Sequence, residues 1–283
     1  MVGTQPPLAS GPRPERVRGR RWWWLLAVAA VAAVVLLIVQ PWTDHPTEPL
    51  PTDAGLSSSA ADVPVAPTGA PTPPPVPGEE AIFDADSMDA LFVTPADLAA
   101  SVPAATDGVR AGLVYEDHAW GLPKGASVVP ASCTTAITVV PKQPRAFTTR
   151  SLVADHFAWD QRVTLLSSGT AAGRAFADLV ATVDACPTYT QVNPGPIRWD
   201  AEPALEGPGA YPSIVQVVTR TADGSSTPMY EGHMLVGNSI VTWTAAAPGT
   251  GTDPDAALAT LGSPTTLNAM VQARAQQAVQ TVE

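Results

Sequence analysis

The sequence predicts an α+β fold, an antiparallel β-sheet with helices on one side, preceded by a single transmembrane helix and a Pro-rich linker. Three observations lead to this prediction. An 18-residue stretch near the amino end carries no charge. Several helices are expected to begin at Ser, Thr or Asp followed by Pro, which is typical of N-caps. The strand-like segments follow one another with hairpin turns, which favours antiparallel pairing.

The uncharged stretch runs from Trp22 to Val39 and would span roughly 27 Å as a helix. A bilayer core is about 30 Å thick, so the segment is long enough to cross it. Five arginines lie in residues 1–21, and positive flanks stay in the cytoplasm. A cleaved signal peptide is the alternative, but its apolar region usually has about 7–15 residues and ends at a small-x-small site. Under either interpretation, the residues after this segment are exported. The length of the apolar segment favours an uncleaved anchor.

These features divide the chain into four predicted parts. Residues 1–21 are a basic cytoplasmic tail and residues 22–39 the transmembrane helix. Residues 40–83 are a disordered Pro-rich spacer, since residues 41–80 hold 11 prolines and little apolar surface. Residues 84–283 are the extracytoplasmic domain. We therefore expect a single-pass protein in the cell membrane, with its amino end in the cytoplasm.

Charge and cysteine content limit the partners and the compartment. The residues after Val39 include 10 basic and 25 acidic side chains, which argues against nucleic acid and anionic lipid as partners. Acidity that only keeps an exported domain soluble explains the same count. Cys133 and Cys186 are the two cysteines of the chain. In an exported domain, two cysteines predict one disulfide.

Helices are expected after Thr94-Pro95, Asp253-Pro254 and Ser263-Pro264. The last of them should run from Pro264 to about Val282. Another helix follows Ser167-Ser168-Gly169-Thr170 and ends before Cys186. Its inner face should carry four apolar residues at helical spacing, namely Phe176, Leu179, Val180 and Val183.

Alternating apolar residues predict the strands. Residues 153–165 are expected to form one long strand with Val153, Phe157, Trp159, Val163 and Leu165 on its buried face. Residues 213–221 form another. Residues 229–236 and 239–246 should form a hairpin around Gly237-Asn238, in a type II′ turn. In that hairpin Gly232 faces Trp243, while Glu231 and His233 lie on the opposite, polar face.

The segment VADHFAWDQRVTLLSSGTAAGRAFADLVATVDAC, residues 153–186, together with Thr94-Pro95-Ala-Asp-Leu and Cys133 before a Thr-rich stretch, resembles the PknH-like extracellular sensor domain. That domain forms the outer part of some mycobacterial serine/threonine kinases and occurs in exported actinobacterial lipoproteins. The resemblance implies an antiparallel sheet flanked by helices and a cleft for an unknown ligand. Roughly 21 residues on the cytoplasmic side are too few for a kinase, so sensing would have to pass through a partner.

Catalytic motifs are missing from the sequence. It contains no Gly-x-Ser-x-Gly elbow, no His-Glu-x-x-His helix and no calcium loop. We therefore expect no catalytic residues, no metal and no cofactor. Glu231 and His233 could join a metal site only if Asp155 or His156 supplied a third ligand.

The remaining candidates for ligand binding are His118, in an acidic loop, and two tryptophans in Gly/Pro-rich surroundings, Trp120 and Trp199, along with Glu231 and His233. For each of them a purely structural role is the simpler explanation. The function expected first is a non-enzymatic sensor that binds a small molecule or an envelope ligand and signals through a membrane partner. An envelope protein-interaction module fits the same features, and an exported hydrolase is disfavoured.

Overall fold

The computed structural model describes residues 78–112, 119–193, 195–249 and 253–282. The predicted tail, the transmembrane segment, most of the spacer and His118 lie outside these residues. None of the helices in the described part of the chain is long and apolar enough to cross a membrane.

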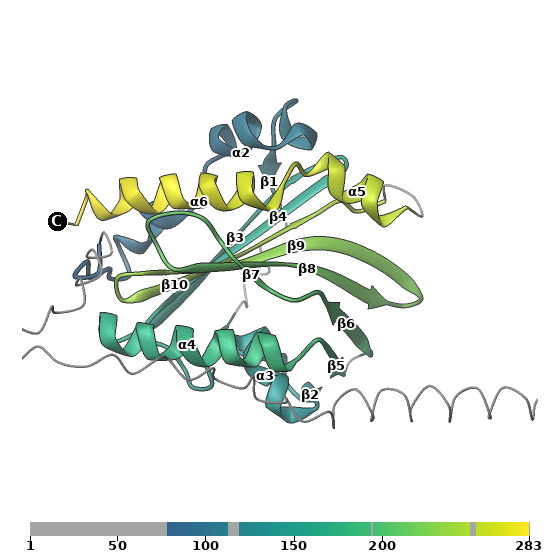
Figure 1. Cartoon of the computed structure of the whole chain (residues 1–283), viewed down its shortest axis with the longest axis horizontal. Helices are drawn as coiled ribbons and strands as arrows, with labels where there is room; N and C mark the ends of the chain where they lie inside the picture. The colour runs from purple at the N-terminus through teal and green to yellow at the C-terminus, as the bar shows by residue number, and fades with distance from the viewer. Residues whose placement is uncertain (1–77, 113–118, 194, 250–252, 283) are drawn as a thin grey trace, which may run out of the picture. The chain divides into compact units, whose positions relative to one another are not determined.

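Ten strands form one sheet, in which every neighbouring pair is antiparallel (Figure 1). The order is β1-β3-β4-β10-β9-β8-β6-β5-β2, and β7 pairs with β8 beside this path. The strands are β1 (Arg110–Ala111), β2 (Ser127–Val129), β3 (Ala146–Ala154), β4 (Phe157–Leu165), β5 (Thr188–Val192), β6 (Ile197–Ala201), β7 (Leu205–Glu206), β8 (Ser213–Ala222), β9 (Ser225–Val236) and β10 (Ser239–Ala246).

The three helices predicted after Thr94, Asp253 and Ser263 begin at side-chain caps. The Thr94 hydroxyl accepts a hydrogen bond from Asp97 N, and the Asp97 carboxylate accepts one from Thr94 N, which completes a capping box. Asp253 and Ser263 cap the next two predicted helices. The α-helices are α2 (Pro95–Ser101), α3 (Thr134–Thr138), α4 (Gly169–Ala185), α5 (Pro254–Thr260) and α6 (Pro264–Val279), and three 3₁₀ turns are η1 (Met88–Leu91), η2 (Pro103–Ala105) and η3 (Ala131–Cys133).

Helices cover both faces of the sheet, so the prediction of helices on one side is wrong (Figure 1). We call the two sides the α6 face and the α4 face, after the longest helix on each. On the α6 face, Trp159 and Trp243 belong to a large apolar core that includes Leu267 and Val271. On the α4 face, Ile214 and Ile240 pack with three residues of α4, namely Phe176, Leu179 and Val183. The central strands are buried on both sides, and alternation in sequence does not reveal this.

The hairpin of β9 and β10 has the predicted register. Val236 pairs with Ser239, and Gly232 lies opposite Trp243. Of the two turn residues, Gly237 has a positive φ of 55°, as a type II′ turn requires of its first residue.

The predicted strand from 153 to 165 is two strands, β3 and β4, joined by a turn at Asp155-His156. A two-residue turn shifts the side-chain parity, because Ala154 pairs with Phe157, so the even-numbered residues of β3 share a face with the odd-numbered residues of β4. Phe157 and Trp159 are buried as expected, but Val153 belongs to β3 and is only partly buried. Its neighbour Leu152 faces Trp159 and takes the core position.

Buried amide side chains attach irregular segments to the sheet and helices. Gln161 accepts from Val93 N and donates to Leu91 O, both at 2.9 Å. Asn238 accepts from Phe83 N at 2.8 Å and donates to Phe83 O at 3.0 Å. Gln272 pairs with the backbone of Tyr211 in the same way. Each amide satisfies a backbone donor and acceptor that would otherwise be costly to bury.

Candidate functional site

A row of polar side chains crosses the α4 face in the middle of the sheet. Strand register places Arg162 of β4, Thr242 of β10 and His233 of β9 side by side. In the next row, Glu231 of β9 lies opposite Gln216 of β8. Two of these five residues, Glu231 and His233, were predicted from the sequence; the other three lie on ordinary strand patterns that gave no signal. We refer to the five as the polar cluster.

The polar cluster is buried, although the sequence predicted helices on one side of the sheet only. Glu231 is 5% exposed, His233 1% and Gln216 6%, and Thr242 is fully buried. Arg162 is only partly buried and lies at the edge of the cluster. The prediction failed because the cover comes from α4 and α3, whose packing is not encoded in the hairpin itself.

Hydrogen bonds join the cluster but leave two atoms without a partner among the described residues. His233 Nδ1 lies 3.0 Å from Thr242 Oγ1, and Gln216 Nε2 donates to Glu231 Oε2 at 3.2 Å. His233 Nε2 and Gln216 Oε1 make no hydrogen bond there. Most buried side-chain polar atoms in proteins have a partner, so two open positions in one cluster are unusual.

Burial shifts both titratable groups of the cluster toward their uncharged forms. Desolvation raises the pKa of Glu231, although the charge of Arg162 and the Gln216 hydrogen bond oppose this. Desolvation lowers the pKa of His233 to about 3, and the Arg162 charge adds to the shift. Glu231 Oε1 and His233 Nε2 are 3.8 Å apart, which is too long for a hydrogen bond. The contact is therefore not an ordinary ion pair.

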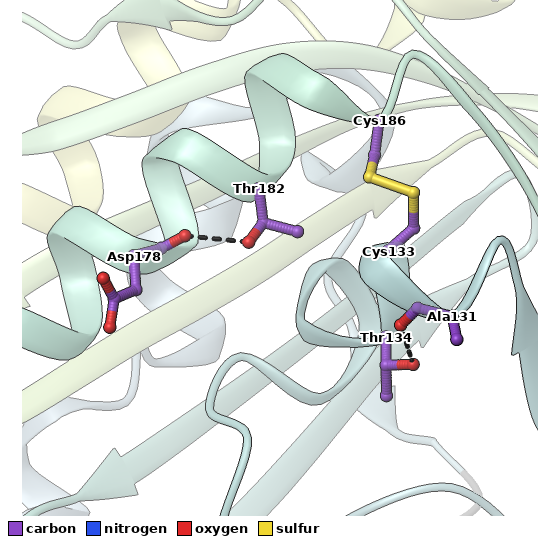
Figure 2. Close-up of a disulfide and its surroundings, with 6 residues drawn as sticks. All are labelled: Ala131, Cys133, Thr134, Asp178, Thr182 and Cys186. Carbon is purple, nitrogen blue, oxygen red and sulfur yellow. Dashed lines mark hydrogen bonds between the residues drawn. A yellow bond between two sulfur atoms is a disulfide. The ribbon is translucent and has the colours of Figure 1, made fainter.

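The cover of the cluster is held together by the predicted disulfide. Cys133, at the end of η3, is bonded to Cys186, which follows α4 (Figure 2). Both cysteines are buried, with 1% and 4% exposure. The bond ties α3, which begins at Thr134, to the carboxyl end of α4. Because of this link, we treat α3, α4 and the disulfide as one unit, the α3–α4 layer.

The two predicted tryptophans contact different parts of the structure. Trp120 is half-buried, donates from Nε1 to Thr138 O at 3.1 Å and packs against the core under α4. Trp199 lies on β6, stacked on Tyr189 with ring centroids 6.2 Å apart, and packs near the disulfide. The two tryptophans therefore belong to different apolar clusters. Tyr189 is the residue that links the second group to the polar cluster, since the charge of Glu231 contributes to its raised pKa after desolvation.

The order hydroxyl, imidazole and carboxylate in Thr242, His233 and Glu231 is that of a hydrolytic triad. Its geometry does not serve catalysis in this conformation, because the Thr242 hydroxyl and the His233 ring have almost no contact with solvent. A nucleophile must meet its substrate, and these side chains meet only the protein interior. The contact gives the buried His233 ring a hydrogen-bond partner at Nδ1, while Nε2 has none among the described residues.

A metal site at the hairpin would need a third ligand. The sequence offered Asp155 and His156, but both lie in the exposed turn between β3 and β4, away from the β9–β10 hairpin. Within the described residues, no group of three or more His, Cys, Asp and Glu side chains could hold a metal ion.

Comparison with known proteins identifies the fold. No protein-family profile matches the chain, and no curated protein matches it. The crystal structure of the extracellular domain of PknH from Mycobacterium tuberculosis matches with a TM-score of 0.50 and 14% identity, covering 71% of this chain and 99% of that one. The chain has a PknH-like fold. At 13% identity, an uncharacterized protein from Mycobacterium smegmatis covers 62% of this chain and 85% of its own, with a TM-score of 0.33.

The PknH-like fold confirms the resemblance that residues 94–98 and 153–186 suggested. At 14% identity the likeness concerns the fold, so the roles of individual residues rest on their own geometry.

Proposed function

We propose that the chain is a membrane-anchored sensor whose PknH-like domain binds a ligand outside the cytoplasm and signals through a partner, without catalysis of its own. The observation that carries this proposal is the fold match, which spans 99% of a domain described as extracellular. The apolar segment at residues 22–39, the arginines before it and the disulfide support the same orientation. In this proposal residues 1–21 are cytoplasmic, residues 40–83 form the spacer and residues 84–283 form the sensor domain.

The polar cluster is the proposed place of ligand action. His233 Nε2 and Gln216 Oε1 are buried without a partner in the described structure, so a ligand that supplied one would gain hydrogen bonds that the free protein lacks. Its entry requires movement of the α3–α4 layer, because that layer closes the α4 face. The ligand would thereby bind one arrangement of the layer better than the other, which is the requirement for a sensor.

Topology is tested first, by protease treatment of intact cells expressing the full chain. Loss of the domain, with protection of the amino-terminal tail, is the expected result. A domain that survives protease in intact cells and is digested only after lysis would contradict the proposal. Thiol labelling gives an independent readout, since Cys133 and Cys186 should resist alkylation until they are reduced.

Ligand binding is tested by thermal-shift screening of the full chain in detergent against envelope fractions and small metabolites. A stabilising fraction should lose its effect on Gln216→Leu and keep it on His156→Gln, because His156 is exposed and remote from the polar cluster. Equal stabilisation of all three proteins would place the ligand elsewhere.

An envelope protein-interaction module is the second candidate, and one observation favours it. Leu205 is 69% exposed beside a pocket of about 110 Å³ that is mainly apolar. Pro203, Pro208 and Pro264 line this pocket, with Glu202 and Glu206 among the remaining lining residues. Photo-crosslinking from position 205 in cells, compared with exposed position 223, would capture a partner at the first position alone if this candidate is right.

A further inference from the structure

Glu231 and His233 are two titratable side chains enclosed together beneath the α3–α4 layer. Their side chains are 7% and 1% exposed, and the carboxylate Oε1 lies 3.8 Å from the imidazole Nε2. Separations of this size make two groups titrate as a coupled pair rather than independently.

The charged surroundings of the pair are few and come mainly from one side. Arg162 of β4 acts on both groups, and the Tyr189 hydroxyl of β5 lies within the field of Glu231. Asp160 of β4 is in the same cross-strand row as Glu231 but is exposed. The helix α4 presents apolar residues, Phe176, Leu179 and Val183, while its charged residues Arg174, Asp178 and Asp184 face solvent. α3 contributes the Ile137 carbonyl, which accepts from Arg162 at 3.4 Å.

Three protonation states are available to such a pair. With no proton, the carboxylate is charged and the imidazole neutral; with two, the imidazole is charged and the carboxyl neutral. Each of these states leaves one net charge on the pair under an apolar cover, which is costly, and the partly buried Arg162 offsets only part of that cost for the carboxylate. The state with one proton has no net charge. We propose that Glu231 and His233 hold a single proton between them while the α3–α4 layer is closed. The consequence, which rests on the layer movement of the proposed function, is that the layer opens without net proton exchange in mildly acidic solution.

The proton balance follows from the ordinary behaviour of the two groups in water. Once exposed, the carboxyl and the imidazole titrate at about pH 4.5 and 6.5. Between these values the open form also holds one proton, which has moved from the Glu231 carboxyl to the His233 ring. Equal proton numbers in the two forms make the opening equilibrium independent of pH. Below about pH 4.5 opening takes up a proton, and acid then favours the open form.

Replacing either Glu231 or His233 should make the opening equilibrium depend on pH, because the closed and open forms of each variant hold different numbers of protons. In Glu231→Gln the closed form holds no proton, and opening binds one at His233, so opening should rise about tenfold per pH unit as the pH falls below about 6.5. In His233→Gln the closed form keeps the Glu231 proton and the open form releases it, so opening should rise as the pH increases above about 4.5. The two variants therefore respond to pH with opposite signs.

The test is hydrogen exchange of the full chain in detergent micelles between pH 4.5 and 6.5, corrected for the intrinsic exchange rate. Peptides from α4 report on the layer, and peptides from α6 serve as the internal reference. The wild-type ratio of α4 to α6 protection should be flat, Glu231→Gln and His233→Gln should slope in opposite directions, and His156→Gln should behave as wild type. A tenfold change per pH unit in the wild type, or flat profiles in both cluster variants, would overturn the proposal.

If Glu231→Gln or His233→Gln does not fold, the pH dependence of exchange in the wild type still tests the proposal. In that case the ring carbon signals of labelled histidine provide a second readout. The His233 ring should stay neutral from pH 6.5 down to pH 4.5. A His233 ring that becomes charged between pH 6.5 and pH 4.5 would show that the pair does not hold a single proton in the closed form.

Discussion

Trp159 and Trp243 stack in the centre of the α6 face, with ring centroids 5.2 Å apart and an angle of 8° between their planes. Gly232 lies opposite Trp243 in the hairpin, and the space over this glycine is filled by the indole ring. A Cβ at position 232 would lie 2.3 Å from Trp243 Cε2. The stacked pair therefore requires glycine on the neighbouring strand.

Gly232→Ala should lower the free energy of unfolding by about 3 kcal/mol, because the ring must leave its stacked position. Urea unfolding followed by tryptophan fluorescence measures this change. Gly173→Ala on α4 is the matched control, since a Cβ there meets nothing within 4 Å. The control should gain about 0.5–1 kcal/mol from better helix propensity. Similar effects at both positions would refute the packing argument.

Loss of the disulfide should destabilise the domain by roughly 4 kcal/mol in the chain-entropy account, since Cys133 and Cys186 are 53 residues apart in sequence. The comparison is between Cys133→Ser with Cys186→Ser and the oxidised parent, by urea unfolding without reductant. Reductant should then destabilise the parent and leave the double variant unchanged. A double variant as stable as the parent would contradict this role.

Asn238→Ala should cost about 3 kcal/mol, because it leaves the Phe83 backbone and the Leu166 carbonyl without their buried partner. Thermal unfolding gives the measurement. Thr182→Ala, which also removes a side-chain bond to a backbone carbonyl but on the outer side of α4, is the control (Figure 2). Its stability should be unchanged or slightly higher, since alanine has the greater helix propensity. Equal losses at the two positions would argue against the anchoring role of Asn238.

The contact between Arg274 of α6 and Asp97 of α2 should be worth about 1–2 kcal/mol. Burial alone would raise the pKa of Asp97, but hydrogen bonds from Arg274 and Thr94 outweigh it and the pKa is lowered. Its contribution is therefore present above the ordinary pKa of about 3.8 and is lost as the pH falls below that value.

Arg274→Met should remove this stabilisation at neutral pH and reduce the loss of stability in acid. The matched control is Arg110→Met, whose partner Asp155 lies 3.7 Å away with both side chains largely exposed. That pair should contribute little. Denaturant unfolding at pH 7 and pH 3 measures the free energy of unfolding of both variants. Equal losses of stability in Arg274→Met and Arg110→Met would contradict the prediction.

Local signals in the sequence were sufficient for much of the fold. Pro after Thr94, Asp253 and Ser263 marked the helix starts, and Gly237-Asn238 fixed the register of the β9–β10 hairpin. These features depend on a few neighbouring residues, so they can be recognised without the rest of the chain.

The features that the sequence did not reveal depend on distant packing. The turn at Asp155-His156 contains neither glycine nor proline, and the apolar Val153 continued the pattern although the core position in β3 belongs to Leu152, so the turn could not be told from a continuing strand. Burial of Glu231 and His233 depends on α4 covering a second face of the sheet. Gln216 and Thr242 joined the polar cluster only through cross-strand register, which the spacing along one strand cannot predict.

The bond between Cys133 and Cys186 makes a covalent ring that contains the exposed turn at Asp155-His156. A protease that cuts this turn opens the ring at one point but releases no fragment. The cleaved chain would migrate as one species on a non-reducing gel and separate into two only after reduction. Damage at this outer loop would therefore leave the two halves of the molecule covalently joined.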